Sequence, residues 1–243
     1  MSELNATFRR SWDLLSNNVI IVVPGLIVGI LATGLVIAFI AAFVLSIIGL
    51  KLVGGFGGAA TVAGVVVSGV IAILLLGVLQ ATFVTAMAGV AWQKGAVTLG
   101  DGWHVFVQCG GPLLGAAALL TLIGLLALAL APFTFLLSLP AFAFLFVYTL
   151  PATVLGGRHA TAALAESWHL AIDNAGDTAV LVLVLIVLWV AGTSLGPLLA
   201  ISTHVFAGIT IAVIHQAILA YGSLVACGAY QRLRERKLVA TEQ

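Results

Sequence analysis

Charge is the property that this sequence has least of. Nine Lys or Arg and eight Asp or Glu occur among 243 residues, so that 7% of the chain is charged, against roughly 25% in an ordinary soluble domain. A water-soluble protein of this length could not cover its surface with so few polar groups. The composition therefore excludes a soluble enzyme. The net charge of +1 is too small to attract a polyanion, so we expect no nucleic-acid partner.

Cysteine is also scarce, and so are catalytic and metal-binding motifs. The two cysteines, Cys109 and Cys227, are too few for a disulfide framework and lack metal-binding spacing. The histidines form no H-E-x-x-H motif, and no Asp or Glu falls within the long apolar runs. We therefore expect a protein without catalytic activity, without a metal site and without a cofactor.

Apolar residues are abundant instead: they make up 63% of the chain, and the mean hydropathy is +1.27. The few charges fall into clusters separated by long uncharged runs, and a helical membrane span needs roughly 20 apolar residues. The sequence predicts an all-α polytopic membrane protein, a single integral membrane domain over residues 1–243, with six transmembrane helices arranged as three hairpins. The predicted spans are about 19–48, 60–92, 111–131, 133–156, 178–196 and 204–229.

The basic residues predict the orientation of these spans. With six spans, only Lys51 falls on one side of the membrane, and Lys and Arg accumulate on the cytoplasmic side. We therefore expect a multi-pass protein of a prokaryotic cytoplasmic (inner) membrane, with both termini in the cytoplasm. The basic residues on the cytoplasmic side are Arg9, Arg10, Lys94, Arg158, Arg232, Arg234, Arg236 and Lys237.

Three tryptophans recur in one context, each in a short amphipathic segment before a predicted hairpin. Trp12, Trp103 and Trp168 are predicted to anchor three cytoplasmic interfacial helices at the inner membrane surface. The segments end in small or amide residues, among them Asn18 and Asn174. The recurrence predicts a threefold parallel repeat over about 1–92, 97–156 and 160–230. Chance placement of Trp at membrane boundaries is the alternative.

Two sets of motifs resemble a known family. They are Phe8-Arg9-Arg10-Ser11-Trp12 with Asn17-Asn18 and Pro24, and the pattern from Tyr148 and Pro151 through Arg158 to Ser167-Trp168-His169-Leu170 and Asn174. Together they resemble six-helix prokaryotic membrane proteins of unknown function, some described as the membrane domain of glycerophosphoryl diester phosphodiesterases. In that family the activity belongs to a separate soluble barrel domain. The resemblance therefore implies a membrane fold and no phosphodiesterase activity for this chain.

Three polar residues are predicted to lie deep in the membrane. By helix rise, His215 lies about 25 Å and Gln80 about 21 Å from the inner boundary, and Gln216 follows His215. A polar group in hydrocarbon is costly unless it is paired. A His215–Gln80 or Gln216–Gln80 contact would line a small polar site or proton path, or would be an interhelical hydrogen bond that fixes packing. The absence of acids from the spans favours the packing role.

The last predicted helix ends in the basic cluster Arg232, Arg234, Arg236 and Lys237. These residues are predicted either to contact anionic lipid headgroups or to serve only as a positive-inside signal. Gly25-x3-Gly29, Gly111-x3-Gly115 and Gly192-x3-Gly196 fit close helix packing, within one chain or between protomers.

These observations favour a non-catalytic membrane scaffold or partner subunit that contacts lipid or other membrane proteins. Membrane lipids are the expected partners, together with a second protein or further copies of this chain. The alternative is a transporter or permease component for a lipid or small hydrophobic molecule. A lined central cavity would favour transport, whereas a tightly packed bundle with outer lipid grooves would favour the scaffold.

Overall fold

The computed structural model describes residues 2–53, 56–200 and 205–241, and within these ranges the regular structure is helical. The N-terminal half contains α1 (Ser2–Asn17), the short 3₁₀ helix η1 (Val19–Val22), α2 (Val23–Val53), α3 (Phe56–Lys94) and α4 (Leu99–Leu130). The C-terminal half contains α5 (Ser138–Phe146), α6 (Thr149–Val154), α7 (Ala160–Asp173), α8 (Ala175–Ala200) and α9 (Val205–Thr241).

Five helical stretches in the described ranges are long and apolar enough to cross a membrane. They are Val19–Ile48, Val62–Lys94, Leu99–Leu130, Ala175–Ser194 and Thr210–Val239. Many large apolar side chains on these helices are exposed, such as Ile30 at 73% and Leu183 at 61%. Apolar surface of this kind is stable when lipid covers it. The fold is therefore all-α, with the helices of a multi-pass membrane protein.

The predicted span over residues 133–156 is wrong as a single helix. After Pro132 the chain turns, and Phe135 and Leu136 adopt positive φ angles of 48° and 66°. The segment then forms α5 with nine residues and α6 with six, each far shorter than the roughly 20 residues of a span. Pro132, Pro140 and Pro151 each lack a backbone N–H, which weakens a continuous helix.

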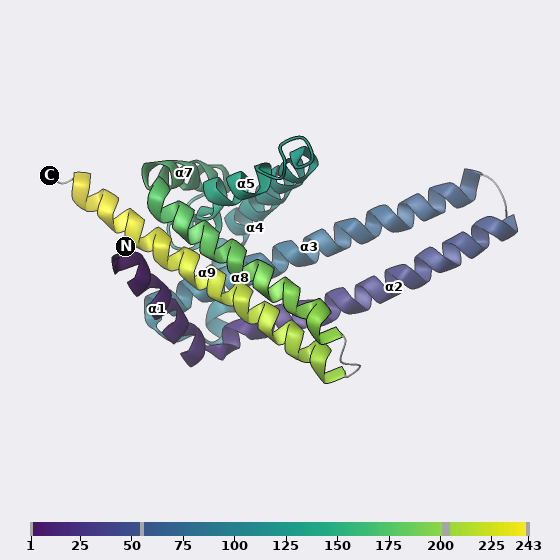
Figure 1. The fold of residues 1–243 in the computed structure, drawn as a ribbon, viewed down its shortest axis with the longest axis horizontal. Coiled ribbons are helices and arrows are strands. Elements are labelled where there is room, and N and C mark those ends of the chain that lie inside the picture. The colour runs from purple at the N-terminus through teal and green to yellow at the C-terminus, as the bar shows by residue number, and fades with distance from the viewer. Residues whose placement is uncertain (1, 54–55, 201–204, 242–243) are drawn as a thin grey trace.

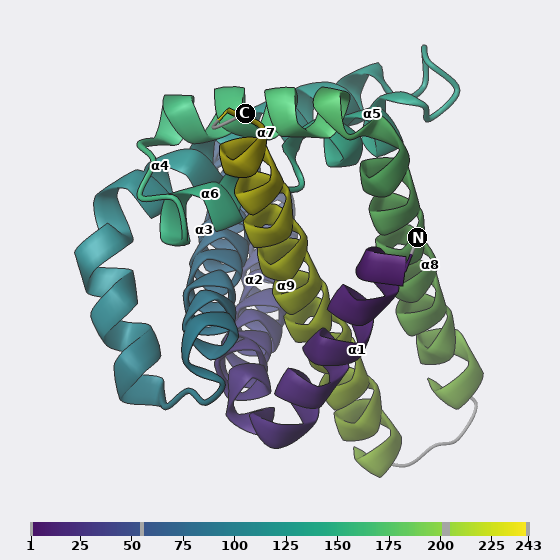
Figure 2. The ribbon, with the colours of Figure 1, turned by 90° about the vertical axis from the view of Figure 1, so that its left-hand side faces the viewer.

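The second predicted interfacial helix is not separate from its span, which corrects the prediction for Trp103. Helix α4 runs without interruption from Leu99 to Leu130 with Pro112 inside it, and Figure 2 shows that it bends along its course. Proline within a helix commonly produces such a bend rather than an end. The segments that contain Trp12 and Trp168 are separate helices, α1 and α7.

An asparagine follows the end of α1 and the end of α7, whereas α4 has no asparagine at the matching position and continues through it. Asn18 and Asn174 adopt nearly the same non-helical conformation, with φ/ψ of −130°/54° and −125°/45°. Each side-chain amide donates to the carbonyl four residues earlier, at 2.9 Å to Leu14 and 3.1 Å to Leu170. Such local bonds compete with the helical ladder. The matching position after Trp103 is Cys109, whose thiol is a weak donor.

The helices form a bundle from which one hairpin projects. Helices α2 and α3 lie side by side and extend well beyond the other helices, while α8 and α9 form a second hairpin that runs obliquely to them (Figure 1). The described core lies in two clusters near the opposite end of α3. One includes Ile21, Met87 and Leu224, and the other includes Tyr148, Leu181 and Leu233.

Candidate functional site

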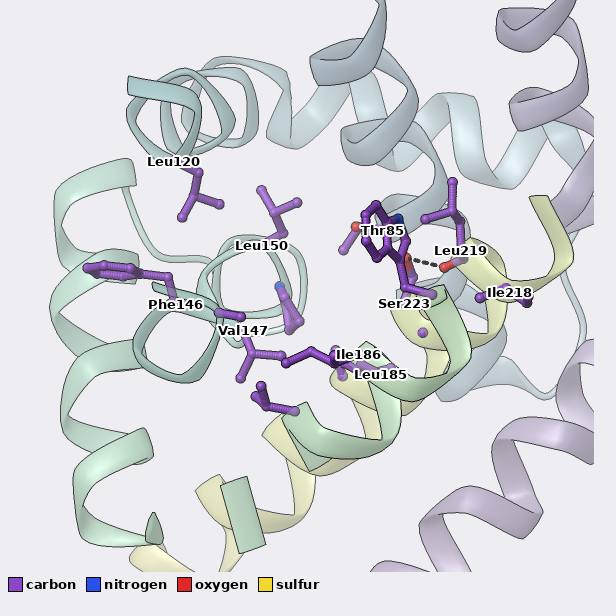
Figure 3. A pocket seen from close by; sticks show the side chains of 16 residues that line it. Thr85, Leu120, Phe146, Val147, Leu150, Leu185, Ile186, Ile218, Leu219 and Ser223 are labelled. Atoms are coloured by element: carbon purple, nitrogen blue, oxygen red, sulfur yellow. Dashed lines mark hydrogen bonds between the residues drawn. The ribbon is translucent and has the colours of Figure 1, made fainter. Parts of the chain in front are cut away.

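An apolar cavity of about 370 Å³ lies between the α8–α9 hairpin and the segment from α4 to α6. Side chains from α3, α4, α5, α6, α8 and α9 line it, among them Leu120, Phe146, Leu150 and Ile186 (Figure 3). Its volume falls in the range of roughly 300–1,000 Å³ that is typical of small-molecule sites. The cavity lies beside α5 and α6, the segment that does not form a continuous span.

The cavity offers little polar chemistry. The Thr85 hydroxyl donates to the Ala81 carbonyl at 2.7 Å. The Ser223 hydroxyl donates to the Leu219 carbonyl at 3.1 Å, the bond drawn as a dashed line in Figure 3. Both hydroxyl protons are therefore already used within their own helices. No ionisable residue lines the cavity within the part of the chain that the structure describes. The lining suits a hydrocarbon chain rather than a polar substrate.

The intramembrane polar residues form the predicted glutamine pair. The Gln80 amide donates to the Gln216 side-chain oxygen at 2.6 Å and joins α3 to α9. A Cβ on Gly25 of α2 would overlap the Gln216 amide and lie 2.8 Å from its Cδ, whereas one on Gly29 would lie 3.7 Å from its Nε2. Gly25-x3-Gly29 thus receives a side chain from another helix, and three helices meet at one hydrogen bond.

His215 lies apart from this pair. It is half-buried, and its Nδ1 lies 3.9 Å from the point where Gly192 of α8 would carry a Cβ. Gly192 mainly accommodates Ile218, whose Cδ1 lies 2.7 Å from that point. The hydrogen bonds found for the described residues include none to His215, and no His215–Gln80 contact occurs among them.

Substitutions in α9 test the packing role of this pair. Gln216→Leu should lower the free energy of unfolding by about 1 kcal/mol, because it leaves the Gln80 amide without its partner in an apolar environment. His215→Leu and His215→Gln should change it by less. Thermal unfolding in detergent measures all three. A His215 variant less stable than Gln216→Leu would contradict the assignment.

The basic cluster at the C-terminal end of α9 is largely paired within the protein. Arg232 donates to Asp177 at 2.9 Å, Arg236 pairs with Asp177 and Glu3, and Lys237 lies 3.6 Å from Asp173. The cluster therefore ties α9 to α1, α7 and α8. It is not a free cationic surface, although at least two pockets open beside it.

One pocket lies between α7 and α9, with a volume of about 510 Å³. Arg158, Arg234 and Glu166 are among its lining residues. Arg158 donates to Glu166 at 2.6 Å, and this bond raises the pKa of the Arg158 guanidinium. Arg234 donates to the Leu155 carbonyl at 3.2 Å.

The second pocket, which we call the α1–α9 pocket, has a volume of about 670 Å³. Residues of α1 and α9 line it together with Trp92 of α3. The Arg10 guanidinium lies 4.6 Å above the Trp92 ring and donates to the Trp92 carbonyl at 3.2 Å. Sequence reasoning missed this pocket, because its residues are distant in the chain.

The three predicted tryptophan anchors share an exposed position. Trp12 is 62% exposed, Trp103 60% and Trp168 43%, although tryptophan usually buries most of its surface. Each ring touches another aromatic ring: Trp12 contacts Tyr221, Trp103 contacts Phe83 and Phe106, and Trp168 contacts Phe146. An exposed ring that also packs against aromatic neighbours is typical of tryptophan at a membrane interface.

No group of three or more His, Cys, Asp or Glu side chains in the described ranges converges on a metal position. Ser194 lies at the centre of a G-x-S-x-G sequence, Gly192 to Gly196. That sequence lies inside α8 and not at the strand-to-helix turn that exposes a nucleophile.

No protein-family model, curated protein or solved structure matches this chain. The resemblance to the phosphodiesterase membrane domains therefore stays a hypothesis.

Proposed function

We propose that this protein is a non-catalytic membrane scaffold or partner subunit that holds a lipid hydrocarbon chain. The observation that carries the proposal is the apolar cavity of about 370 Å³ between α8–α9 and α4–α6. Its hydroxyls are internally bonded, so a ligand would gain affinity through burial of apolar surface. The exposed tryptophans fit the same role at the membrane interface.

A filled cavity tests this proposal. Ala143→Phe on α5 places a ring at a position that lines the cavity, and we expect it to abolish photo-crosslinking of a diazirine-bearing phospholipid acyl chain to α8 and α9. Ala141→Phe is the matched control, because Ala141 is exposed on the same helix and does not line the cavity. The readout is mass spectrometry of crosslinked peptides in lipid nanodiscs. Equal labelling of both variants would refute the proposal.

Transport of a hydrophobic molecule is the second proposed function, and the lined cavity favours it over a solid bundle. In reconstituted vesicles, a transporter would move a fluorescent lipid between leaflets faster than protein-free vesicles do, and Ala143→Phe would slow this movement. A scaffold would bind the lipid without moving it.

We further propose that both termini lie in the cytoplasm of a prokaryotic cell and that the chain contains three related units. The distribution of Lys and Arg supports the orientation, and the matching geometry of Asn18 and Asn174 supports a relation between the first and third units. A cysteine at position 57 should react with an impermeant reagent applied from outside, and one at position 243 should not. Outside labelling of position 243 would contradict the orientation.

A further inference from the structure

One of the arginines that line the α1–α9 pocket has buried donors that the protein itself does not use. Arg10, Arg232 and Arg236 all line it. Both terminal nitrogens of Arg236 bond to carboxylates: the guanidinium pairs with Glu3 and donates to Asp177 at 3.3 Å. Arg232 donates to Asp177 through only one nitrogen, Nη2. Its Nε and Nη1 are buried and have no hydrogen-bond partner among the described residues.

Arg10 keeps its positive charge uncompensated by any ion pair found in the described ranges. Its contacts are the neutral carbonyl and ring of Trp92. Glu3 and Asp177 pair with arginines, whereas Glu235, which also lines the pocket, accepts from the neutral Gln231 amide at 3.0 Å and keeps its negative charge. Two arginines of one pocket therefore retain charge or donors for an added acceptor.

We propose that the α1–α9 pocket binds a phosphate-type oxyanion, supplied by a lipid headgroup or by free phosphate. A guanidinium donates charge-assisted hydrogen bonds to phosphate oxygens, and Arg232 has two unused donor nitrogens, Nε and Nη1, on different edges of its guanidinium. Leaving buried donors unsatisfied is costly, so an oxyanion that accepts from them stabilises the site. Arg10 supplies the charge that opposes the anion.

The surroundings of the pocket fit an amphiphile. Ala6, Trp92 and Val239 provide apolar wall beside the arginines, and α9 carries the pocket at its C-terminal end, which is predicted to lie at the cytoplasmic interface. Phosphate groups of lipids occupy that depth. The lipid source, though not the oxyanion chemistry, rests on the proposed function as a lipid-binding protein.

Calorimetric titration of the full-length protein in a neutral maltoside detergent tests the site with three probes. These are inorganic phosphate, dihexanoyl phosphatidic acid, and dihexanoylglycerol, which has the same chains without phosphate. Arg10→Gln and Arg232→Lys should each weaken binding of a phosphate-bearing probe by about tenfold, since a hydrogen bond to a charged group is lost. Arg232→Lys retains the charge beside Asp177 and removes only the planar donor set.

Arg9→Gln is the matched control, because Arg9 neighbours Arg10 on α1, is exposed and does not line the pocket. Binding of phosphatidic acid alone identifies a lipid headgroup as the ligand, and binding of inorganic phosphate alone identifies the free anion. Either result supports the site if Arg10→Gln and Arg232→Lys weaken the binding of the probe and Arg9→Gln does not. Equal binding of dihexanoylglycerol, equal weakening by Arg9→Gln, or no binding of either phosphate probe overturns it.

The outcome is separable from that of the proposed function. Acyl-chain crosslinking that Ala143→Phe abolishes, together with absent phosphate binding, would overturn the oxyanion site alone. Phosphate binding that depends on Arg10 and Arg232, together with equal crosslinking of Ala143→Phe and Ala141→Phe, would support this site and refute the apolar one.

Discussion

Asn18→Ala should lower the free energy of unfolding by about 3 kcal/mol, since it removes several hydrogen bonds from one buried side chain. Asn18 is 5% exposed. Its amide donates to Leu14 at 2.9 Å and to Gly95 at 3.1 Å, and its oxygen accepts from the Val97 backbone at 2.9 Å. Alanine would leave the Val97 N–H unsatisfied and would release the α3–α4 loop from the end of α1. Thermal unfolding in detergent is the measurement.

Asn17→Ala provides the control for this variant. Asn17 is the preceding residue, is exposed and closes α1. We expect its replacement to change stability by less than about 0.5 kcal/mol, as is usual for surface positions. Similar losses in the two variants would show that the bonds of Asn18 do not stabilise the junction.

Gly228→Ala should destabilise the protein by about 2 kcal/mol through overpacking. A Cβ at this position of α9 would lie within 2.5 Å of the Trp92 Cζ2 atom. Trp92 is only 6% exposed and belongs to a core cluster, so its ring has little room to move. A displaced ring would also disturb its contact with Arg10 in the α1–α9 pocket. We therefore expect both a lower unfolding temperature and weaker phosphate binding.

Gly222→Ala is the matched change on the same helix. There the added methyl group would lie 3.3 Å from Cδ2 of Leu185, a flexible side chain that lines the apolar cavity. A shift of that methyl group accommodates the new atom, so the loss should stay below about 1 kcal/mol. A Gly222→Ala variant as unstable as Gly228→Ala would contradict the role of the rigid Trp92 ring.

The break between α4 and α6 shows where sequence reasoning about spans fails. The run 133–156 contains no charged residue, and its apolar composition resembles that of a transmembrane helix. Its prolines are visible in the sequence, but Pro112 lies inside the continuous helix α4. Whether a proline bends a helix or ends it depends on what packs around the freed carbonyl groups, and a linear pattern does not contain that information.

The glutamine pair shows the opposite case. Gln80 and Gln216 are conspicuous because they lie in otherwise apolar helices at comparable predicted depth. A buried amide in hydrocarbon requires a partner, so the sequence predicts that Gln80 pairs with either His215 or Gln216, and the structure shows the bond to Gln216. Their fit against Gly25 does not, because a G-x3-G spacing predicts close approach without identifying the group that approaches.

The sequence by itself determined the helical class and the approximate position of five helices that are long and apolar enough to cross a membrane, because these follow from charge and hydropathy along the chain. Only the tertiary structure decided that Arg10, Trp92 and Arg232 line one pocket and that residues of six helices line one apolar cavity. It also showed that most cationic side chains of α9 are paired with acids of α1, α7 and α8. Such sites depend on how helices distant in sequence pack against one another, and a periodic apolar sequence leaves that choice open.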